Sequence, residues 1–207
     1  MREIDKDREI SETYNYNYAD KFDIEDNEER RIYLNCEIDE SVVDSAVYHI
    51  LRYNRLDKDI PVEDRVPIKV YINSPGGSVS DGYALIDAIR LSKTPVYTIN
   101  LANCLSMGLL IFIAGHKRFA MPHSQFLLHD GFSGGFDSVN KLQDRIKFET
   151  EQVEEMTKEF VVNNTKISDG EYDKNLRREW YFLPKEGKTI GVVDYIVGED
   201  CEFDDVI

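Results

Sequence analysis

Cysteine is scarce in this sequence and shows no pattern typical of a disulfide framework or a zinc site. The 207 residues include only 3 cysteines, which lie far apart and form no CxxC pair. Disulfide-rich and zinc-binding proteins place cysteines at short, repeated spacings. The 4 histidines likewise show no HxH or HxxxH spacing. We therefore predict no metal site and a reducing, cytoplasmic compartment.

No apolar run is long enough to cross a membrane. The stretch 94–116 has no Asp, Glu, Lys or Arg, but Pro95, Asn100 and Asn103 interrupt it, and its longest continuous apolar part is 109–114. A transmembrane helix needs about 20 apolar residues. The first residues also lack the apolar segment of a secretory signal. We expect the stretch to be buried core and the chain to have no membrane partner.

Basic residues are too few to balance the acidic ones, since 25 − 40 gives a net charge of −15. The first 30 residues contribute 5 − 11 = −6 and residues 199–207 contribute −5, so the rest carries only −15 + 11 = −4. A strongly negative protein repels polyanions, and we expect no nucleic-acid partner. We predict an acidic arm at 1–29, expected to be mobile, one domain over 30–198 and an acidic tail at 199–207.

The hydrophobic pattern alternates strands and helices. Short apolar or alternating runs predict strands at 32–34, 66–72, 95–101, 125–128 and 192–197. Helical periodicity predicts helices at 41–51, after Gly77, at 106–114 and from Ser168. This order predicts right-handed crossovers, a mostly parallel sheet and hence an α/β fold. The charged segment 53–65 is predicted to be a loop.

A longer helix is predicted after the strand at 125–128. Its apolar residues follow a seven-residue repeat, and they are Val139, Leu142, Ile146, Val153, Met156 and Phe160. So narrow a stripe on a long helix needs another surface to pack against. The sequence leaves two surfaces open, which are the rest of its own domain and a partner subunit.

Three features that carry possible chemistry follow predicted strands. Ser106 begins an apolar helix, where free backbone amides and the helix dipole suit a developing oxyanion. The pair Gly76-Gly77 lets backbone amides approach a ligand closely. His129 follows the strand at 125–128, at the carboxyl end where α/β sheets place their sites. Each also has an ordinary structural interpretation, such as a helix cap for Ser106. No glycine motif has full dinucleotide or Walker spacing, so we predict no nucleotide binding by this chain.

Together these motifs resemble ClpP, the proteolytic subunit of the Clp protease, from about residue 31 to 197. The motifs that carry the resemblance are Tyr71-Ile-Asn-Ser-Pro-Gly-Gly77, the helix Gly82–Ile89, Ser106-Met-Gly108, the His129 strand and Gly191-Val-Val-Asp194. The interval from Gly77 to Ser106 matches the ungapped interval of the family. The resemblance implies a ClpP/crotonase-like α/β fold of repeated ββα units. A handle, formed by a strand and a long helix, would protrude at about 132–163.

The resemblance also implies a serine endopeptidase that forms an acyl-enzyme. Carried over by position, Ser106 would be the nucleophile and His129 the general base. The amides of Gly77 and Met107 would form the oxyanion hole. No metal or other cofactor is implied for this chain.

The third triad member is an Asp in the family. An ungapped count back from Gly191 places Glu179 at that position, and a Glu can hold an imidazole as an Asp does. Asp173 and Asp194 remain alternatives.

The family's assembly consists of two stacked heptameric rings that enclose a chamber, with a hexameric AAA+ unfoldase that binds ATP and supplies unfolded protein. The sequence departs from the family at Cys104 and Leu105, at Asp130-Gly131 and in its acidic arm. Two alternatives stay open. One is a non-catalytic or weakly active subunit of a mixed ring, and the other is a phage-type peptidase that works without an ATPase.

Overall fold

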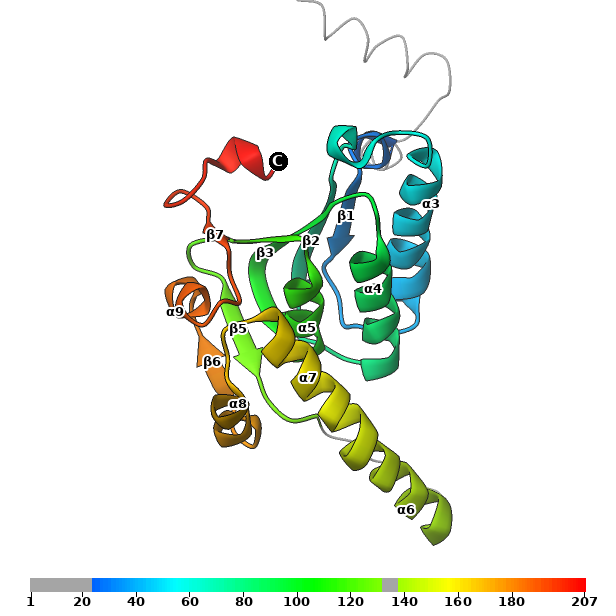
Figure 1. Cartoon of the computed structure of the whole chain (residues 1–207), viewed down its shortest axis with the longest axis vertical. Coiled ribbons are helices and arrows are strands. Elements are labelled where there is room, and N and C mark those ends of the chain that lie inside the picture. Colours follow the sequence, from blue (N-terminus) through cyan, green and yellow to red (C-terminus); the bar gives the residue numbers. More distant parts are fainter. Residues whose placement is uncertain (1–23, 132–137) are drawn as a thin grey trace, which may run out of the picture.

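A computed structural model describes residues 24–131 and 138–207 and confirms the α/β fold with a mostly parallel sheet (Figure 1). The main path of the sheet is parallel throughout and runs in the order β1 (Arg31–Leu34), β2 (Ile68–Ser74), β3 (Val96–Leu105), β4 (Lys117–Ala120) and β7 (Tyr195–Ile196). A branch leaves it through β5 (Gln125–Leu128), parallel to β3, and β6 (Trp180–Phe182), antiparallel to β5. The sheet therefore forks along β3, whose first half pairs with β4 and whose last residues pair with β5.

The helices fall into three groups. Beside the sheet lie η1 (Val43–Val47), α3 (Tyr48–Leu56), η2 (Val62–Asp64), α4 (Val79–Leu91) and α5 (Met107–Ala114). A continuous rod consists of α6 (Val139–Phe148), η3 (Glu149–Val153) and α7 (Glu154–Asn164). The C-terminal part contains α8 (Asp169–Leu176), α9 (Pro184–Thr189) and η4 (Phe203–Asp205).

Some predicted boundaries are wrong. The predicted loop at 53–65 begins too early, because α3 continues to Leu56. Tyr53 explains the extension, since its ring is buried and its hydroxyl donates to the Asn27 carbonyl. The predicted strand at 192–197 shrinks to two residues, and the strand β4 was missed. By contrast, α5 is buried along its whole length, and Ser168 forms the expected capping box with Glu171.

Side chains alternate between two faces of the sheet. Along β2, Ile68, Val70 and Ile72 point into the main core, which includes the residues of α5. Tyr71 points to the opposite face. That face carries a second, smaller cluster, which consists of Tyr71, Ile99, Phe119, Val197 and Val206. The alternation follows from the two-residue period of a strand.

The C-terminal tail packs over this second cluster. Val206 is only 2% exposed, and the Tyr71 hydroxyl donates a hydrogen bond of 2.5 Å to its carbonyl oxygen. The Lys69 ammonium donates to the Ile207 carbonyl. Burial raises the pKa of Tyr71 to about 12, so its hydroxyl remains a donor at neutral pH. The acidic residues of the tail thus precede an apolar anchor.

The rod of α6, η3 and α7 extends away from the body of the molecule (Figure 1). Its C-terminal part is anchored, because Val161 is fully buried and the Phe160 ring lies 6.4 Å from the ring of Tyr83. At the other end Val139 is 71% exposed and Ile146 is also exposed. The sequence left two surfaces open for the rod, its own domain and a partner subunit, and its own domain covers only one end. The end of the rod packs on its own domain, and its beginning leaves an apolar stripe uncovered.

A buried ion pair ties the start of the domain to the end of α3. The Arg30 guanidinium donates to both oxygens of Asp57, at 2.6 and 2.7 Å, and Asp57 is only 1% exposed. The Thr94 hydroxyl donates to the same carboxylate at 2.8 Å. Hydrogen bonding by Arg30 holds the pKa of Asp57 below its usual value. The charge on Asp57 is therefore fully compensated inside the fold.

Replacing this carboxylate should make stability less dependent on pH. At pH 7 we expect Asp57→Asn to lower the free energy of unfolding by about 2–3 kcal/mol, because Arg30 loses its charged partner. The contribution of Asp57 is complete above the ordinary carboxyl pKa of about 4 and disappears as the pH falls through the lower pKa of the folded state. Thermal unfolding between pH 7 and 2 should show the two proteins converge in acid. Asp59→Asn, at an exposed site, is the control, and a difference that is constant with pH would contradict the expectation.

Candidate active site

Ser106 occupies a sharp turn between β3 and α5. Its backbone has φ 53 and ψ −122, a left-handed conformation that is rare for residues other than glycine. The Ser106 amide donates to the Leu127 carbonyl at 3.0 Å, which fastens the turn to β5. The Ser106 side chain makes no capping bond to α5. The helix-cap interpretation is therefore wrong, and the turn presents the hydroxyl for another role.

The loop that contains Gly76 packs directly against this turn. An added Cβ at Gly76 would lie 2.7 Å from Ser106 Cβ and 2.8 Å from the Leu105 oxygen, so there is no room for a side chain. Gly76 and Gly77 also have positive φ values of 100 and 145. Both glycines are thus required by local geometry, and Gly76 places the loop beside the serine.

The amides of Gly77 and Met107 lie on these two adjoining segments. The glycine loop is held by two hydrogen bonds, from the Ile38 amide to the Gly76 oxygen at 2.8 Å and from the Ser78 amide to the Ile38 oxygen at 2.7 Å. Neither bond uses the Gly77 amide. Met107 is the first residue of α5, where amides have no partner within the helix. The arrangement can therefore offer two backbone donors close to Ser106.

His129 and Glu179 meet through the pairing of β5 with β6. Leu128 is opposite Trp180 in this antiparallel pair, so the next residue outward on each strand is His129 and Glu179. His129 Nδ1 lies 3.8 Å from Glu179 Oε1, which is within ion-pair range but longer than a hydrogen bond. The imidazole is 17% exposed and the carboxylate 63%. Strand register thus brings together two residues that are 50 positions apart in the chain.

The other two carboxylates are paired with cations elsewhere. Asp173 on α8 lies 2.9 Å from the Lys158 ammonium. Asp194 lies 2.6 Å from the Arg118 guanidinium and also accepts from the Arg118 amide, which joins β4 to the segment before β7. Of the three carboxylates that the sequence left open, the structure places Glu179 beside His129.

Sequence reasoning missed one neighbour of Glu179. The neighbouring Glu179 carboxylate raises the pKa of Tyr181, mainly through side-chain hydrogen bonding. Tyr181 lies two residues after Glu179, on the same side of β6, because strand side chains alternate. The alternation of side chains along a strand could have placed Tyr181 beside Glu179, but the sequence does not show how β6 pairs with β5.

Ser106 and His129 leave neighbouring strands at the same carboxyl edge. Leu105 pairs with Leu127 in the parallel register, so both residues follow that pair closely. Across residues 24–131 and 138–207, no hydrogen bond joins Ser106 Oγ to His129. Catalytic hydrogen bonds are often long before substrate binds and shorten in the complex. The described geometry is therefore one of proximity at the sheet edge without an aligned relay.

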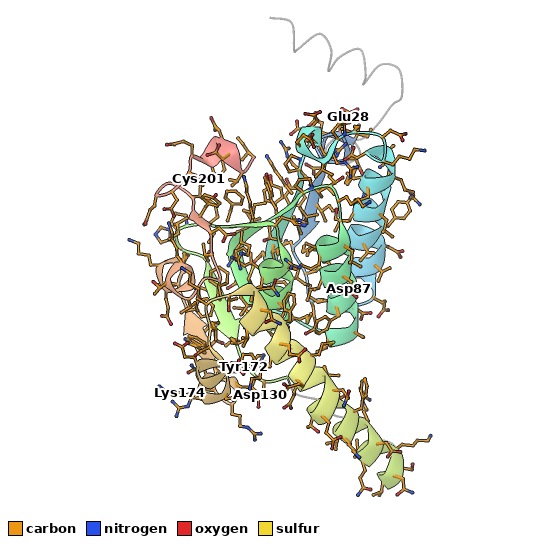
Figure 2. The ribbon with its side chains drawn as sticks, viewed as in Figure 1. Glu28, Asp87, Asp130, Tyr172, Lys174 and Cys201 are labelled. Carbon is orange, nitrogen blue, oxygen red and sulfur yellow. The ribbon has the colours of Figure 1, made fainter. Side chains whose placement is uncertain are left out.

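The segment after His129 is fixed by α8. The Asp130 amide donates to the Leu176 carbonyl at 2.7 Å. Figure 2 shows Asp130 near Tyr172 of this helix. Residues 132–137, with which the predicted handle begins, lie outside the described residues.

Two other side chains with reactive groups, Cys104 and His116, have structural surroundings. Cys104, two residues before Ser106, is fully buried, and burial raises the pKa of its thiol well above the usual value. It therefore stays a neutral thiol. His116 Nδ1 accepts the Val96 amide hydrogen at 2.9 Å, a structural role at the start of β3. The described part of the chain contains no group of three or more potential metal ligands and no helix long and apolar enough to span a membrane.

A serine turn beside paired glycines, with a histidine and a carboxylate at the same sheet edge, is typical of acyl-transfer enzymes. Comparison with known proteins narrows this class. The chain matches the family model described as Clp protease over residues 18–200, and it therefore belongs to the Clp protease family. The predicted ClpP-like fold is thus confirmed, and the family is one of peptidases.

Curated relatives agree with this membership. The chain is 31% identical over 179 residues to the ATP-dependent Clp protease proteolytic subunit 2 of Prochlorococcus marinus (strain MIT 9312), covering 84% of each chain. It is 29% identical to the proteolytic subunit 3 of Parasynechococcus marenigrum (strain WH8102), covering 84% of this chain and 85% of the relative. At this distance the chain is a divergent member of the family.

A methyl group at Gly76 should disturb the serine turn. We expect Gly76→Ala to lower the free energy of unfolding by about 2 kcal/mol, because the added Cβ overlaps the turn and φ is strained. The thermal midpoint should fall by about 4–8 °C. Gly131→Ala is the matched control, since a Cβ there would meet nothing within 4 Å. Equal shifts for the two variants would show that residue 76 is not confined by Ser106.

Proposed function

We propose that this chain is a serine endopeptidase subunit of Clp type that cleaves unfolded proteins to short peptides through an acyl-enzyme. The observation that supports the proposal is the strained turn of Ser106, which packs against Gly76 at the carboxyl edge of the sheet, with the Met107 amide nitrogen beside the same contact. Strain of this kind persists where the surrounding structure enforces it, and it concentrates at active sites. Membership of the Clp protease family supports the same reaction.

The proposed mechanism uses groups of this chain alone. His129 accepts the proton of Ser106 Oγ as the oxygen attacks the substrate carbonyl carbon, and the amides of Gly77 and Met107 stabilise the oxyanion. His129 then donates the proton to the leaving amine. Water, activated by His129, releases the acyl group and restores the serine. Glu179 orients the imidazole, and no metal or other cofactor takes part.

We further propose that the chain works inside a self-compartmentalised assembly. The relatives are named as proteolytic subunits of an ATP-dependent protease, which supports stacked rings of this chain and a separate AAA+ partner that binds ATP. The exposed apolar stripe at Val139 and Ile146 supports burial of the rod against a second copy. In this arrangement the chamber restricts access, and the substrates are unfolded polypeptides.

A weakly active subunit of a mixed ring is the second candidate. The 3.8 Å separation of His129 and Glu179 and the missing Ser106–His129 hydrogen bond in the described residues favour it. Cleavage by the purified chain alone, assembled only from itself, decides between the two. A homomer that labels with a fluorophosphonate but cleaves no peptide would support the second candidate.

Removing the serine hydroxyl should abolish chemistry and leave the fold intact. We expect Ser106→Ala to lose fluorophosphonate labelling and to lower peptide cleavage at least about 10³-fold. Its thermal midpoint and native mass should match those of the wild type. Ser41→Ala, at an exposed site, should keep full activity. Cleavage by Ser106→Ala at the wild-type rate would refute the assignment of the nucleophile.

The three carboxylates can be separated by their effects on cleavage. We expect Glu179→Gln to lower kcat about 10²–10⁴-fold, because an amide does not stabilise the imidazolium. Asp173→Asn should change kcat less than about threefold, since this residue pairs with Lys158 on the surface. Peptide cleavage assays at pH 7.5 or so measure both variants. A larger loss for Asp173→Asn than for Glu179→Gln would reverse the assignment.

A further inference from the structure

Three asparagines form a ladder of side chains across the carboxyl edge of the sheet. Asn103 Nδ2 donates to Asn73 Oδ1 at 3.1 Å, and Asn73 Nδ2 donates to Asn35 Oδ1 at 2.7 Å. They come from β3, from β2 and from the residue after β1. The register explains their alignment, because Leu34 pairs with Ile72 and the next residues outward are Asn35 and Asn73. The proposed mechanism uses none of these amides.

The ladder lines a cavity of about 380 Å³ that adjoins the serine turn. Pro75 and Leu105 form part of the same wall. Pro75 leads into Gly76, and Leu105 directly precedes Ser106. The glycine loop and the serine turn of the candidate active site therefore also form part of the cavity wall. An extended peptide advances about 3.3 Å per residue, so a residue close to the scissile bond can reach this space.

The lining of the cavity is mixed, because Pro75 and Leu105 lie beside the asparagines, and among the described residues that line it Glu37 is the one acidic or basic side chain. The ladder ends in a hydrogen-bond acceptor, Asn103 Oδ1, and at its other end in a donor, Asn35 Nδ2. Glu37 contributes an exposed carboxylate. The neighbouring Cys36 stays a neutral thiol, because burial and the charge of Asp39 raise its pKa. Amide and carboxylate oxygens in this arrangement favour a cationic side chain that donates hydrogen bonds.

The acidic side of the cavity is fixed relative to the glycine loop. Ile38, which follows Glu37, exchanges backbone hydrogen bonds with Gly76 and Ser78 at 2.8 and 2.7 Å. A displacement of Glu37 would therefore also displace the glycine loop that contacts Ser106. Such preorganisation reduces the cost of binding a side chain in the cavity.

We propose that this cavity is a specificity subsite for an Arg or Lys side chain of the substrate, within two residues of the scissile bond. This inference rests on the proposed peptidase function, because it assigns a substrate preference to the same site. Glu37 supplies the charge, and Asn103, held by Asn73, supplies a neutral acceptor. A leucine side chain at the same position would leave the Glu37 and Asn103 oxygens unpaired. A glutamate side chain would be repelled by the Glu37 carboxylate.

The test compares peptides that differ at one residue. Internally quenched peptides carry Arg, Leu or Glu at each of the two positions on either side of a central bond. The full-length wild type should cleave the Arg peptide about tenfold better, in kcat/KM, than the Glu peptide at one of these positions. Glu37→Gln and Asn103→Leu should each reduce the Arg-to-Leu ratio about three- to tenfold. Glu63→Gln, at an exposed site on η2, is the control and should leave the ratio unchanged.

Binding separates this inference from the proposed function. In the Ser106→Ala background, fluorescence anisotropy measures the affinity of the fluorescein-labelled Arg and Leu peptides with and without Glu37→Gln. Preference for Arg that depends on Glu37 supports the subsite, even if the wild type neither labels with a fluorophosphonate nor cleaves. Labelling and cleavage by the wild type, with an Arg-to-Leu ratio that neither variant changes, would overturn the subsite and leave the peptidase proposal standing. Equal binding of both peptides in the Ser106→Ala background would overturn it as well.

Discussion

The candidate site depends on one steric constraint. Residue 76 must be a glycine, because a side chain there would overlap the turn that contains Ser106. The glycine loop and the serine turn come from different strands and meet at a distance that only a glycine allows. The Met107 amide nitrogen lies at the same contact, 3.1 Å from a Cβ added at Gly76, and Ser106 itself has a positive φ of 53. The wholly buried α5 supports the turn from behind. Local strain is thus maintained by the packing of the core.

A second constraint is the fork in the sheet. Asn100 lies where β3 changes its partner from β4 to β5, and its buried amide donates to the Gln125 carbonyl at 3.0 Å. The bond fixes the start of β5, whose other end carries His129. Pairing of β5 with β6 then sets Glu179 opposite His129. The position of the imidazole is therefore a consequence of sheet topology, and the fork is as important to the site as the serine turn.

The two ends of the chain contribute charge, but the described C-terminal end also contributes packing. The tail has five acidic residues and yet ends with Val206 buried against Tyr71. The rod shows the reverse arrangement, with a buried anchor at Val161 and an exposed apolar stripe farther out. The tail completes a core within this chain, whereas the stripe at Val139 and Ile146 is exposed. Net charge alone did not distinguish these two roles.

The sequence by itself determined the α/β class, the order of its elements and the family, because hydrophobic periodicity and the spacing from Gly77 to Ser106 are local properties of the chain. It also identified Ser106 and His129 as candidates. It favoured Glu179 by an ungapped count from Gly191 but left Asp173 and Asp194 open, and it did not find the asparagine ladder or the partner of Val206. Those relations depend on strand register and on the fork at β3, which join residues far apart in sequence. Only the tertiary structure decided these relations. Glu179 lies near His129 because β5 pairs with β6, and the distance between the two residues along the chain does not reveal this pairing.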